Sequence, residues 1–446
     1  MNKTIVSLHL IALIGLLILT AAKVEAREGC QVCGMYLDLD QRTCSLLVDK
    51  EGHEMRTCGI ACMLRLVSDA GGPAAFRRIR VKDFNTGQEL DGETATYVIG
   101  SNVVPDMLPS ILAFADRKSA EAFARKHGGE VIDFSQALLS ISPTAMTMPV
   151  RIKSAVLPAR GGTMAGIGYM VMTMDEVALG SDSIDPADFV RRPGQMMGPK
   201  EMTSNGEMFM ANHSVTDSDN FAIKIPYFEK KMEMYTMGGM NVATTKNNGL
   251  GDMEISWRHA FWKNNFYSRF LTGLASVSLP SGDFDTDFIA SPMMQLGRGA
   301  LAGTAGILYS QRMGNFWLHS SLTYNLGLEN SDDYRYGDIA SLGAALHYTP
   351  NYDLLFGLEL DASNYAKDEY QGAKQDATGG FRSFITAVAN WRFLTALGGS
   401  FSLKGAFGLP LYENLNHYEI GNMEKAQMGG GYMGSISLSF ARRFLY

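Results

Sequence analysis

The chain has 446 residues, about three times the length of a typical domain, so more than one folded unit is expected. Its 39 Lys and Arg against 46 Asp and Glu give a net charge of −7, which argues against nucleic-acid binding. Charged residues are only 19% of the chain, Gly (47) and Met (27) are abundant, and all 5 Cys lie between residues 30 and 62, so a uniform soluble enzyme is disfavoured.

A secretory signal peptide is predicted for residues 1–26. Lys3 precedes an apolar run, 5–19, that is too short and too polar to span a membrane comfortably. The stretch 24–26 supplies the small residues that a signal peptidase requires, so cleavage is expected after Ala26. The residues before Cys30 do not form a lipoprotein signal.

An α+β domain is predicted for residues 27–142. Alternation around Leu46 and Val48 predicts a short strand, and the spacing of apolar residues predicts helices over 60–67 and 119–127. Gly128 follows the second helix as a stop signal.

The cysteines of this domain form two close pairs. Cys30 and Cys33 are separated by two residues, and Cys58 and Cys62 by three, with methionines next to both pairs. Thiolate and thioether sulfur select Cu(I), whereas four thiolates would also suit Zn²⁺. An exported chain normally oxidises such pairs to disulfides, although an odd number leaves one thiol over. Spacing alone therefore leaves metal binding and disulfide bonding equally open.

The segment CQVCGMYL at 30–37, the Cys62-Met63 pair and the tract 96–134 resemble NosL-type copper chaperones. The resemblance implies Cu(I) bound in the periplasm and an acceptor such as a nitrous oxide reductase-type cuproprotein. It implies a pool of sulfur ligands: Cys30, Cys33, Met35, Cys62, Met63 and Met107. Cys44 and Cys58 are additional to the simplest form of the family motif. The spacing of Cys58 and Cys62 is also similar to treble-clef metal domains, which keeps Zn as the alternative metal.

A linker is predicted for residues 143–162, where Pro and Gly favour a flexible or extended connection. Fifteen of the 27 Met lie between residues 146 and 240. One hypothesis is that they face the lumen of a barrel as weak Cu(I) ligands in a relay, and the other is that they are adaptable apolar filling. The methionines that share strand faces are Met170, Met172, Met174, Met208, Met210, Met232 and Met234.

An all-β transmembrane antiparallel β-barrel is predicted for residues 163–446. Apolar and polar residues alternate over runs of about ten residues, the length that spans the hydrocarbon of an outer membrane. Twelve strands are predicted, at 166–178, 204–216, 220–235, 251–263, 265–280, 302–313, 315–328, 338–350, 352–365, 381–394, 399–412 and 431–446. The stretches 221–227, 249–255, 278–282 and 297–299 resemble outer-membrane proteins and transporter-like barrels.

Together these patterns predict copper(I) binding and trafficking at the bacterial envelope, without an enzymatic reaction. The barrel would lie among outer-membrane lipids and the N-terminal domain in the periplasm, with copper ions as the cargo and no nucleic acid as partner. The alternative is an outer-membrane transporter or porin for a small solute, with a disulfide-stabilised N-terminal docking or plug domain. A thiol–disulfide exchanger is disfavoured because no thioredoxin-like βαβ unit surrounds Cys30 and Cys33.

Overall fold

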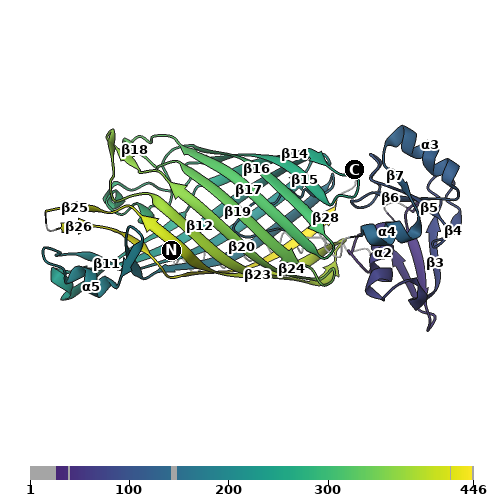
Figure 1. Ribbon diagram of the computed structural model, residues 1–446, viewed down its shortest axis with the longest axis horizontal. Helices are drawn as coiled ribbons and strands as arrows, with labels where there is room; N and C mark the ends of the chain where they lie inside the picture. Colours follow the sequence, from purple (N-terminus) through teal and green to yellow (C-terminus); the bar gives the residue numbers. More distant parts are fainter. Residues whose placement is uncertain (1–26, 39–40, 142–147, 422, 444–446) are drawn as a thin grey trace.

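The computed structural model describes residues 27–38, 41–141, 148–421 and 423–443. The predicted signal peptide, residue 142 of the predicted N-terminal domain and residues 143–147 of the predicted linker lie outside the described residues. An α+β domain sits at one end of an elongated β-barrel (Figure 1). In the part of the chain that is described, no helix is long and apolar enough to cross a bilayer.

The N-terminal domain consists of small antiparallel sheets and helices, which confirms the predicted α+β class. Asp116 caps α3 and Asp133 caps α4, each by accepting a backbone hydrogen bond from the first helical turn. The sheet orders are β2-β1-β3-β4 and β6-β5-β7, around a core that includes Leu47, Met63 and Tyr97. The elements are β1 Ser45–Asp49, β2 Glu54–Thr57, α2 Ile60–Asp69, η1 Pro73–Ala75, β3 Phe76–Lys82, β4 Glu89–Asp91, β5 Thr96–Ile99, β6 Ile111–Phe114, α3 Arg117–His127, β7 Glu130–Ile132 and α4 Phe134–Ser140.

The second body is an antiparallel barrel. Its strands are β8 Gly162–Met174, β11 Gly198–Ser214, β12 Asp219–Thr236, β13 Asn241–Leu250, β14 Met253–Lys263, β15 Arg269–Leu279, β16 Ala302–Met313, β17 Phe316–Gly327, β19 Ile339–Tyr348, β20 Leu354–Tyr365, β23 Gly380–Ala396, β24 Gly399–Leu415 and β28 Tyr432–Arg443. Among the described residues these fill twelve wall positions, as predicted, because β13 and β14 lie end to end along β12. Pairing of β11 with β12 closes the wall.

The sequence pattern missed one strand of this wall. β13 is largely polar and lacks the alternation that predicts a strand, yet it pairs with β12 from Tyr227 to Thr236. β11 also begins earlier than predicted because its first residues pair with the end of β12. Both differences arise from backbone pairing, which does not depend on apolar side chains.

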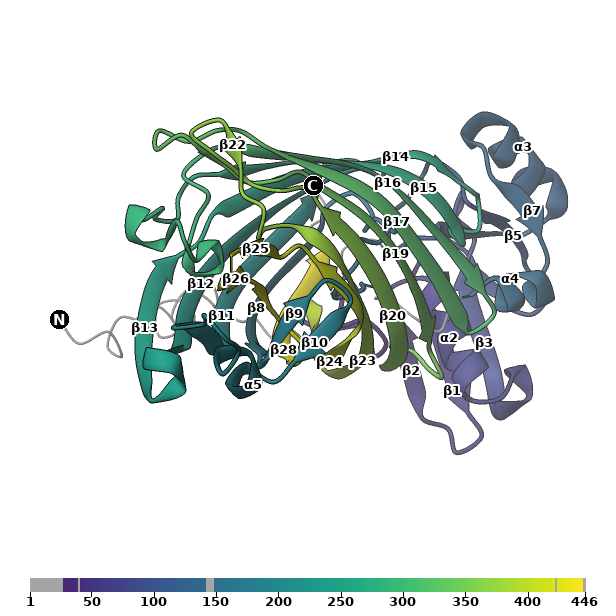
Figure 2. The ribbon, with the colours of Figure 1, turned by 60° about the vertical axis from the view of Figure 1, so that its left-hand side comes forward.

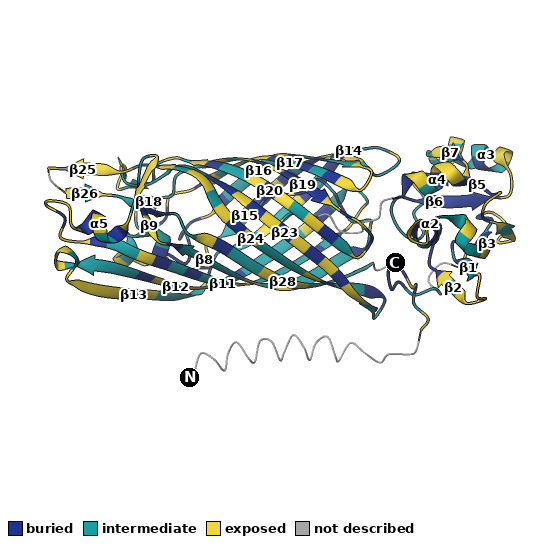
Figure 3. Ribbon diagram, turned by 60° about the horizontal axis from the view of Figure 1, so that its bottom comes forward, coloured by how far each residue is buried: buried dark blue, intermediate teal, exposed yellow. Residues whose placement is uncertain are grey.

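The wall presents apolar side chains outward and polar ones inward. On β15, exposed and buried residues alternate, and Thr272 is fully buried while Leu271 is exposed. Leu342, Leu358 and Phe407 on other strands are also about half exposed. Exposed and buried positions alternate along the strands of the barrel (Figure 3). A continuous apolar band around a closed barrel is the surface that a membrane requires. The predicted transmembrane barrel is confirmed.

The two ends of the barrel differ. At the end nearest the N-terminal domain, strands are joined by short turns such as 314–315 and 397–398. At the other end, long loops such as 175–197 and 280–301 carry small elements (Figure 2). These elements are β9 Glu176–Leu179, β10 Asp182–Ile184, α5 Pro186–Val190, η2 Met237–Gly239, η3 Thr286–Phe288, η4 Pro292–Met294, β18 Tyr334–Arg335, β21 Glu369–Tyr370, β22 Ala373–Lys374, β25 Tyr418–Ile420, β26 Met423–Lys425 and β27 Gln427–Gly429.

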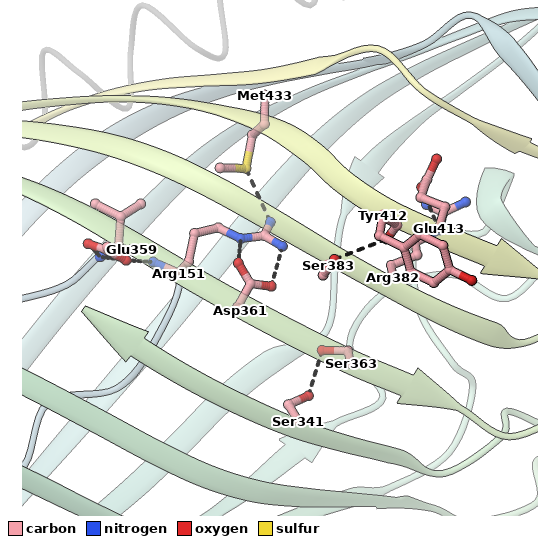
Figure 4. A network of polar contacts seen from close by, with 11 residues as sticks. Arg151, Ser341, Glu359, Asp361, Ser363, Arg382, Ser383, Tyr412, Glu413 and Met433 are labelled. Atoms are coloured by element: carbon pink, nitrogen blue, oxygen red, sulfur yellow. Dashed lines mark hydrogen bonds and ion pairs between the residues drawn. The ribbon is translucent and has the colours of Figure 1, made fainter. Parts of the chain in front are cut away.

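Residues 148–161, here called the lumen segment, enter the barrel before β8 begins. Glu359 on β20 accepts hydrogen bonds from the backbone N–H groups of Val150 and Arg151. Asp361, on the same face of β20, binds the Arg151 guanidinium through two contacts of 2.8 and 2.7 Å (Figure 4). The segment is therefore attached to one side of the wall by charged, inward-facing groups.

The second half of the lumen segment contacts strands further round the wall, from β16 to β14. Ala155 donates its N–H to Ser310 on β16, and its carbonyl accepts from Thr272 on β15. Arg258 on β14 donates to the carbonyl of Ser154. The described part of the predicted linker thus crosses the lumen, with its polar backbone satisfied by the barrel interior.

Candidate metal centre

Cys30 and Cys33 lie in a tight turn before β1. The backbone N–H of Cys30 donates to the carbonyl of Met35, and the N–H of Gly34 donates to the carbonyl of Cys30. Gly34 has a φ of +76°, a conformation that glycine adopts without strain. The turn brings both sulfur atoms of the pair to the same side. It lies in a loop rather than at a helix start, so it lacks the setting of a thioredoxin-like motif.

Cys58 and Cys62 flank the beginning of α2. Cys58 precedes Gly59, the N-cap residue, and Cys62 lies in the first helical turn. A Cβ atom at position 59 would lie only 1.6 Å from a carboxylate oxygen of Asp106, so a larger residue would displace that side chain. Thr43 donates a hydrogen bond to the carbonyl of Cys58 and fixes the entry to the helix.

The four cysteines converge on one point. The sulfur atoms of Cys30, Cys33, Cys58 and Cys62 all lie within 4.8 Å of one another, and all four are buried free thiols. The Sγ atoms of Cys33 and Cys58 are 3.5 Å apart, and those of Cys58 and Cys62 are 3.8 Å apart. A tetrahedral site with metal–sulfur bonds of about 2.3 Å has sulfur atoms roughly 3.8 Å apart. The cluster is therefore able to hold a metal ion.

Met107 supplies a fifth sulfur atom. It lies between β5 and β6, and its Sδ accepts a hydrogen bond of 3.6 Å from the thiol of Cys62. Its backbone N–H is bonded to the carboxylate of Asp106, the residue that abuts Gly59. The loop that carries Met107 is thus tied to the start of α2, so the thioether and the thiol of Cys62 are held together.

The thiols differ in their protonation. The pKa of Cys30 is lowered, chiefly because Cys33 and then Cys58 donate hydrogen bonds to its sulfur. The pKa values of Cys58 and Cys62 are raised, because their thiols donate to Cys30 and Cys33 and because burial disfavours a thiolate. A metal ion bound by these sulfur atoms would replace the thiol protons.

A buried arginine offsets negative charge at the cluster. Arg65, one turn after Cys62 on α2, places its Nη1 3.9 Å from the sulfur of Cys62. Burial alone would lower its pKa, but electrostatic interaction with Tyr352 and with the clustered cysteines raises it. Arg65 therefore stays charged and favours ionised sulfur nearby.

The barrel completes the wall of this site. Tyr352, in the turn between β19 and β20, packs against the cysteines and lies between the guanidinium groups of Arg65 and Arg392, 4.4 and 3.7 Å from its ring centre. Arg392 also donates to the carbonyl of Val32 in the cysteine turn. A Cβ atom on Gly34 would lie 2.2 Å from the carbonyl oxygen of Gly399, so the turn rests directly on the barrel.

The structure places most of the predicted sulfur ligands in one cluster and Met63 elsewhere. Cys30, Cys33, Met35 and Cys62 are buried together, and Met107 packs against them. Met63 lies instead in the main core of the domain. Cys58, which the predicted pool omitted, belongs to the cluster, and its pairing with Cys62 across three intervening residues was the signal that could have found it. Cys44 lies outside the cluster and donates to the carbonyl of Leu37.

A cavity of about 240 Å³ joins the cysteine cluster to the barrel. Cys33, Met35 and Met107 line it from the domain, whereas Met148 of the lumen segment and Met164 of β8 line it from the barrel. The metal centre therefore opens toward the mouth of the barrel.

The model of the NosL family matches residues 21–139. The N-terminal domain is a NosL-type domain. Its sequence is 29% identical over 123 residues to the copper-binding lipoprotein NosL of Stutzerimonas stutzeri, a match that covers 25% of this chain and 64% of that protein. The chain thus spans less than two thirds of the length of this curated relative.

Solved structures resemble each of the two bodies. The COG4313 outer membrane channel from Pseudomonas putida F1 is 13% identical, with a TM-score of 0.50, and the match covers 66% of this chain and all of that one. The copper chaperone NosL from Shewanella denitrificans is 20% identical with a TM-score of 0.23, covering 26% of this chain and 92% of that one. Beyond the NosL-type domain, the chain therefore has the fold of an outer-membrane channel, as predicted.

Proposed function

We propose that this protein binds Cu(I) in its NosL-type domain and carries it to or from an outer-membrane barrel, without catalysing a reaction. The observation that carries the proposal is the group of four buried thiols within 4.8 Å, with the Met107 thioether against Cys62. The proposed ligands are Cys30, Cys33, Cys58, Cys62 and Met107. A thioether beside thiolates favours Cu(I) over Zn²⁺, whose structural sites are closed by thiolate and imidazole ligands.

In this proposal the N-terminal domain lies in the periplasm. Bacterial outer-membrane barrels have short turns on the periplasmic side and long loops outside. The domain lies against the short-turn end, where Arg443 of β28 donates to the carbonyl of Val104 and Arg312 of β16 donates to that of Ser140. Copper leaving the cysteine cluster would enter the cavity at the barrel mouth or meet a periplasmic acceptor protein there.

The alternative, a solute transporter with a disulfide-stabilised plug domain, has less support. The four clustered cysteines are free thiols, and the lumen is crossed by a short segment rather than by the folded domain. The matched relatives are a copper-binding protein and a channel, which supports binding and transport rather than catalysis.

Anaerobic Cu(I) titration of the full chain in detergent, against a chromophoric Cu(I) chelator, tests the proposal. Stoichiometric binding is expected, with affinity falling in Cys33→Ser and Met107→Leu by more than the roughly 10–100-fold typical of changes around a ligand. Cys44→Ser is the matched control, because this cysteine lies outside the cluster, and its affinity should equal that of the parent. Stoichiometric Zn²⁺ binding without Cu(I) binding would refute the proposed cargo.

A further inference from the structure

A second group of sulfur side chains lies at the other end of the barrel lumen. Its buried members all are methionines, namely Met174, Met202, Met232, Met294 and Met428, here called the methionine cluster. Met172, Met234, Met293 and Phe288 pack around it. These residues come from three wall strands and two loop regions, so the fold has brought them together from distant parts of the sequence.

Strand register aligns three of these methionines side by side. Met202 on β11 is the direct partner of Met174 on β8 and of Met232 on β12. Directly opposed side chains have Cβ atoms about 4.5–5.5 Å apart, and all three lie on the buried inward face. Three thioethers can therefore meet across adjacent strands.

Loop contacts hold Met294 in place. Lys230 donates to the carbonyls of Met293 and Gln295, and Asn247 donates to that of Met294. These bonds fix the short helix η4 beneath the loops, with Met294 turned into the cluster.

Met428 is held by a strand of its own. β27 pairs with β9, where Met428 is opposite Val177, and Arg382 donates to the carbonyl of Met428. Arg382 also places Nη1 3.7 Å from the sulfur of Met174 and forms an ion pair of 3.3 Å with Glu413. The guanidinium charge beside the cluster is thus offset by a carboxylate.

The composition of the cluster distinguishes it from ordinary packing. The core around Leu47 and Tyr97 in the N-terminal domain is filled by a mixture of Leu, Ile, Val, Ala and aromatic residues. Among the described residues buried in that core, Met63 is the one methionine. Every buried member of the methionine cluster is Met, although Leu would fill the same volume. The property that Met adds over Leu is the thioether sulfur, which is a soft ligand.

The cluster is open to an ion. A cavity of about 720 Å³ at this end of the lumen is lined by Met232, Met234, Met293 and Met428. Between this cavity and the cysteine cluster lies the lumen segment, and Arg151 of that segment contacts the sulfur of Met433 at 3.4 Å. Met433 is the register partner of Met172, which packs against the cluster. Sulfur-containing side chains therefore lie on both sides of the lumen segment.

We propose that the methionine cluster is a second Cu(I) site, built from thioethers alone and placed at the loop end of the barrel lumen. It rests on the proposed function only for the identity of the metal. Thioethers bind Cu(I) without losing a proton and more weakly than thiolates, so this site would release the ion more readily than the cysteine cluster.

The test measures Cu(I) stoichiometry on the full chain in detergent under anaerobic conditions. One variant replaces Cys30, Cys33, Cys58 and Cys62 by Ser, and a second adds Met174→Leu, Met202→Leu and Met232→Leu. Leu preserves apolar volume, and unchanged far-UV circular dichroism and barrel heat-modifiability would show that the wall is intact. The matched control in the same background replaces the exposed Met196, Met240 and Met313 by Leu.

The chain without the four clustered cysteines, which still contains Cys44, is expected to keep about one Cu(I) equivalent, whose X-ray absorption shows sulfur ligands. The three Leu substitutions in the cluster should abolish that equivalent, and the three control substitutions should leave it unchanged. Absence of Cu(I) binding in the chain without the four clustered cysteines, or equal binding by the cluster and control variants, would overturn the inference. If removing the four cysteines leaves the total Cu(I) bound unaltered, the proposed cysteine site fails while the methionine site stands.

Discussion

The ion pair between Arg151 and Asp361 gives the most quantitative test of the lumen segment. Both side chains are mostly buried, with 21% and 12% of their surfaces exposed, and the pair is bidentate. Asp361→Ala would leave the guanidinium without its carboxylate inside the barrel. Removing one partner of a buried pair costs about 3–5 kcal/mol, and the residual exposure favours the lower value.

A loss of about 3 kcal/mol multiplies the equilibrium constant for displacing the segment on the order of 100-fold. Hydrogen exchange followed by mass spectrometry, with the protein in detergent, measures this directly, because the amides of Val150, Arg151 and Ala155 are hydrogen-bonded only while the segment is seated. The expected result is exchange on the order of 100-fold faster over 148–158 in the Asp361→Ala variant.

Ser363→Ala is the matched control for this experiment. Ser363 lies two residues further along the same face of β20, but its hydroxyl bonds to Ser341 within the wall at 2.8 Å (Figure 4). Exchange in the lumen segment should be unchanged in this variant. Equal exchange in the parent and Asp361→Ala chains, or an equal rise in Ser363→Ala, would refute the assignment of the ion pair as an anchor.

Three further outcomes are expected. Gly34→Ala should detach the cysteine turn from the barrel and increase proteolysis of the N-terminal domain. Gly52→Ala is the control: Gly52 has φ +97° with open space around it, so this substitution should cost only about 1 kcal/mol of backbone strain. Tyr352→Ala should raise the rate at which a maleimide labels the cysteine cluster, and an unchanged rate would show that the tyrosine does not cover it. Removal of copper with a chelator should lower the melting temperature of the NosL-type domain, because a ligand present at 100 times its Kd stabilises the folded state by about 2.7 kcal/mol. Equal melting temperatures of the copper-bound and copper-free protein would contradict binding to the folded state.

Part of the metal centre could be predicted from the local sequence. The spacing of the two cysteine pairs left metal binding and disulfide bonding open, and the resemblance to NosL-type chaperones implied the ligand pool. The structure brings Cys30, Cys33 and Cys62 of that pool together. Met63 follows Cys62 directly, and a step of one residue turns a side chain by about 100° around a helix, so it points into the core instead. Cys58 lies before the extended N-cap residue Gly59, outside the helix, and the chain entry into α2 brings it to the cluster.

In the barrel, too, the sequence pattern predicted part of the structure and backbone pairing determined the rest. Alternation of apolar and polar residues determined strands, their approximate number and their membrane-facing side, because lipid and lumen impose opposite demands on successive side chains. The largely polar β13 carried no such signal, and pairing along β12 alone placed it in the wall.

The sequence by itself therefore determined two bodies, a cluster of soft ligands near the N-terminus and a methionine-rich region in the barrel. Only the tertiary structure decided that Tyr352 and Arg392 of the barrel cover the cysteines and that the lumen segment crosses the interior. It also decided that methionines from three adjacent strands and from loops distant in the sequence form one cluster. The physical reason is that local patterns record the environment of each residue, apolar or polar, whereas the identity of its neighbours depends on register and closure of the whole wall.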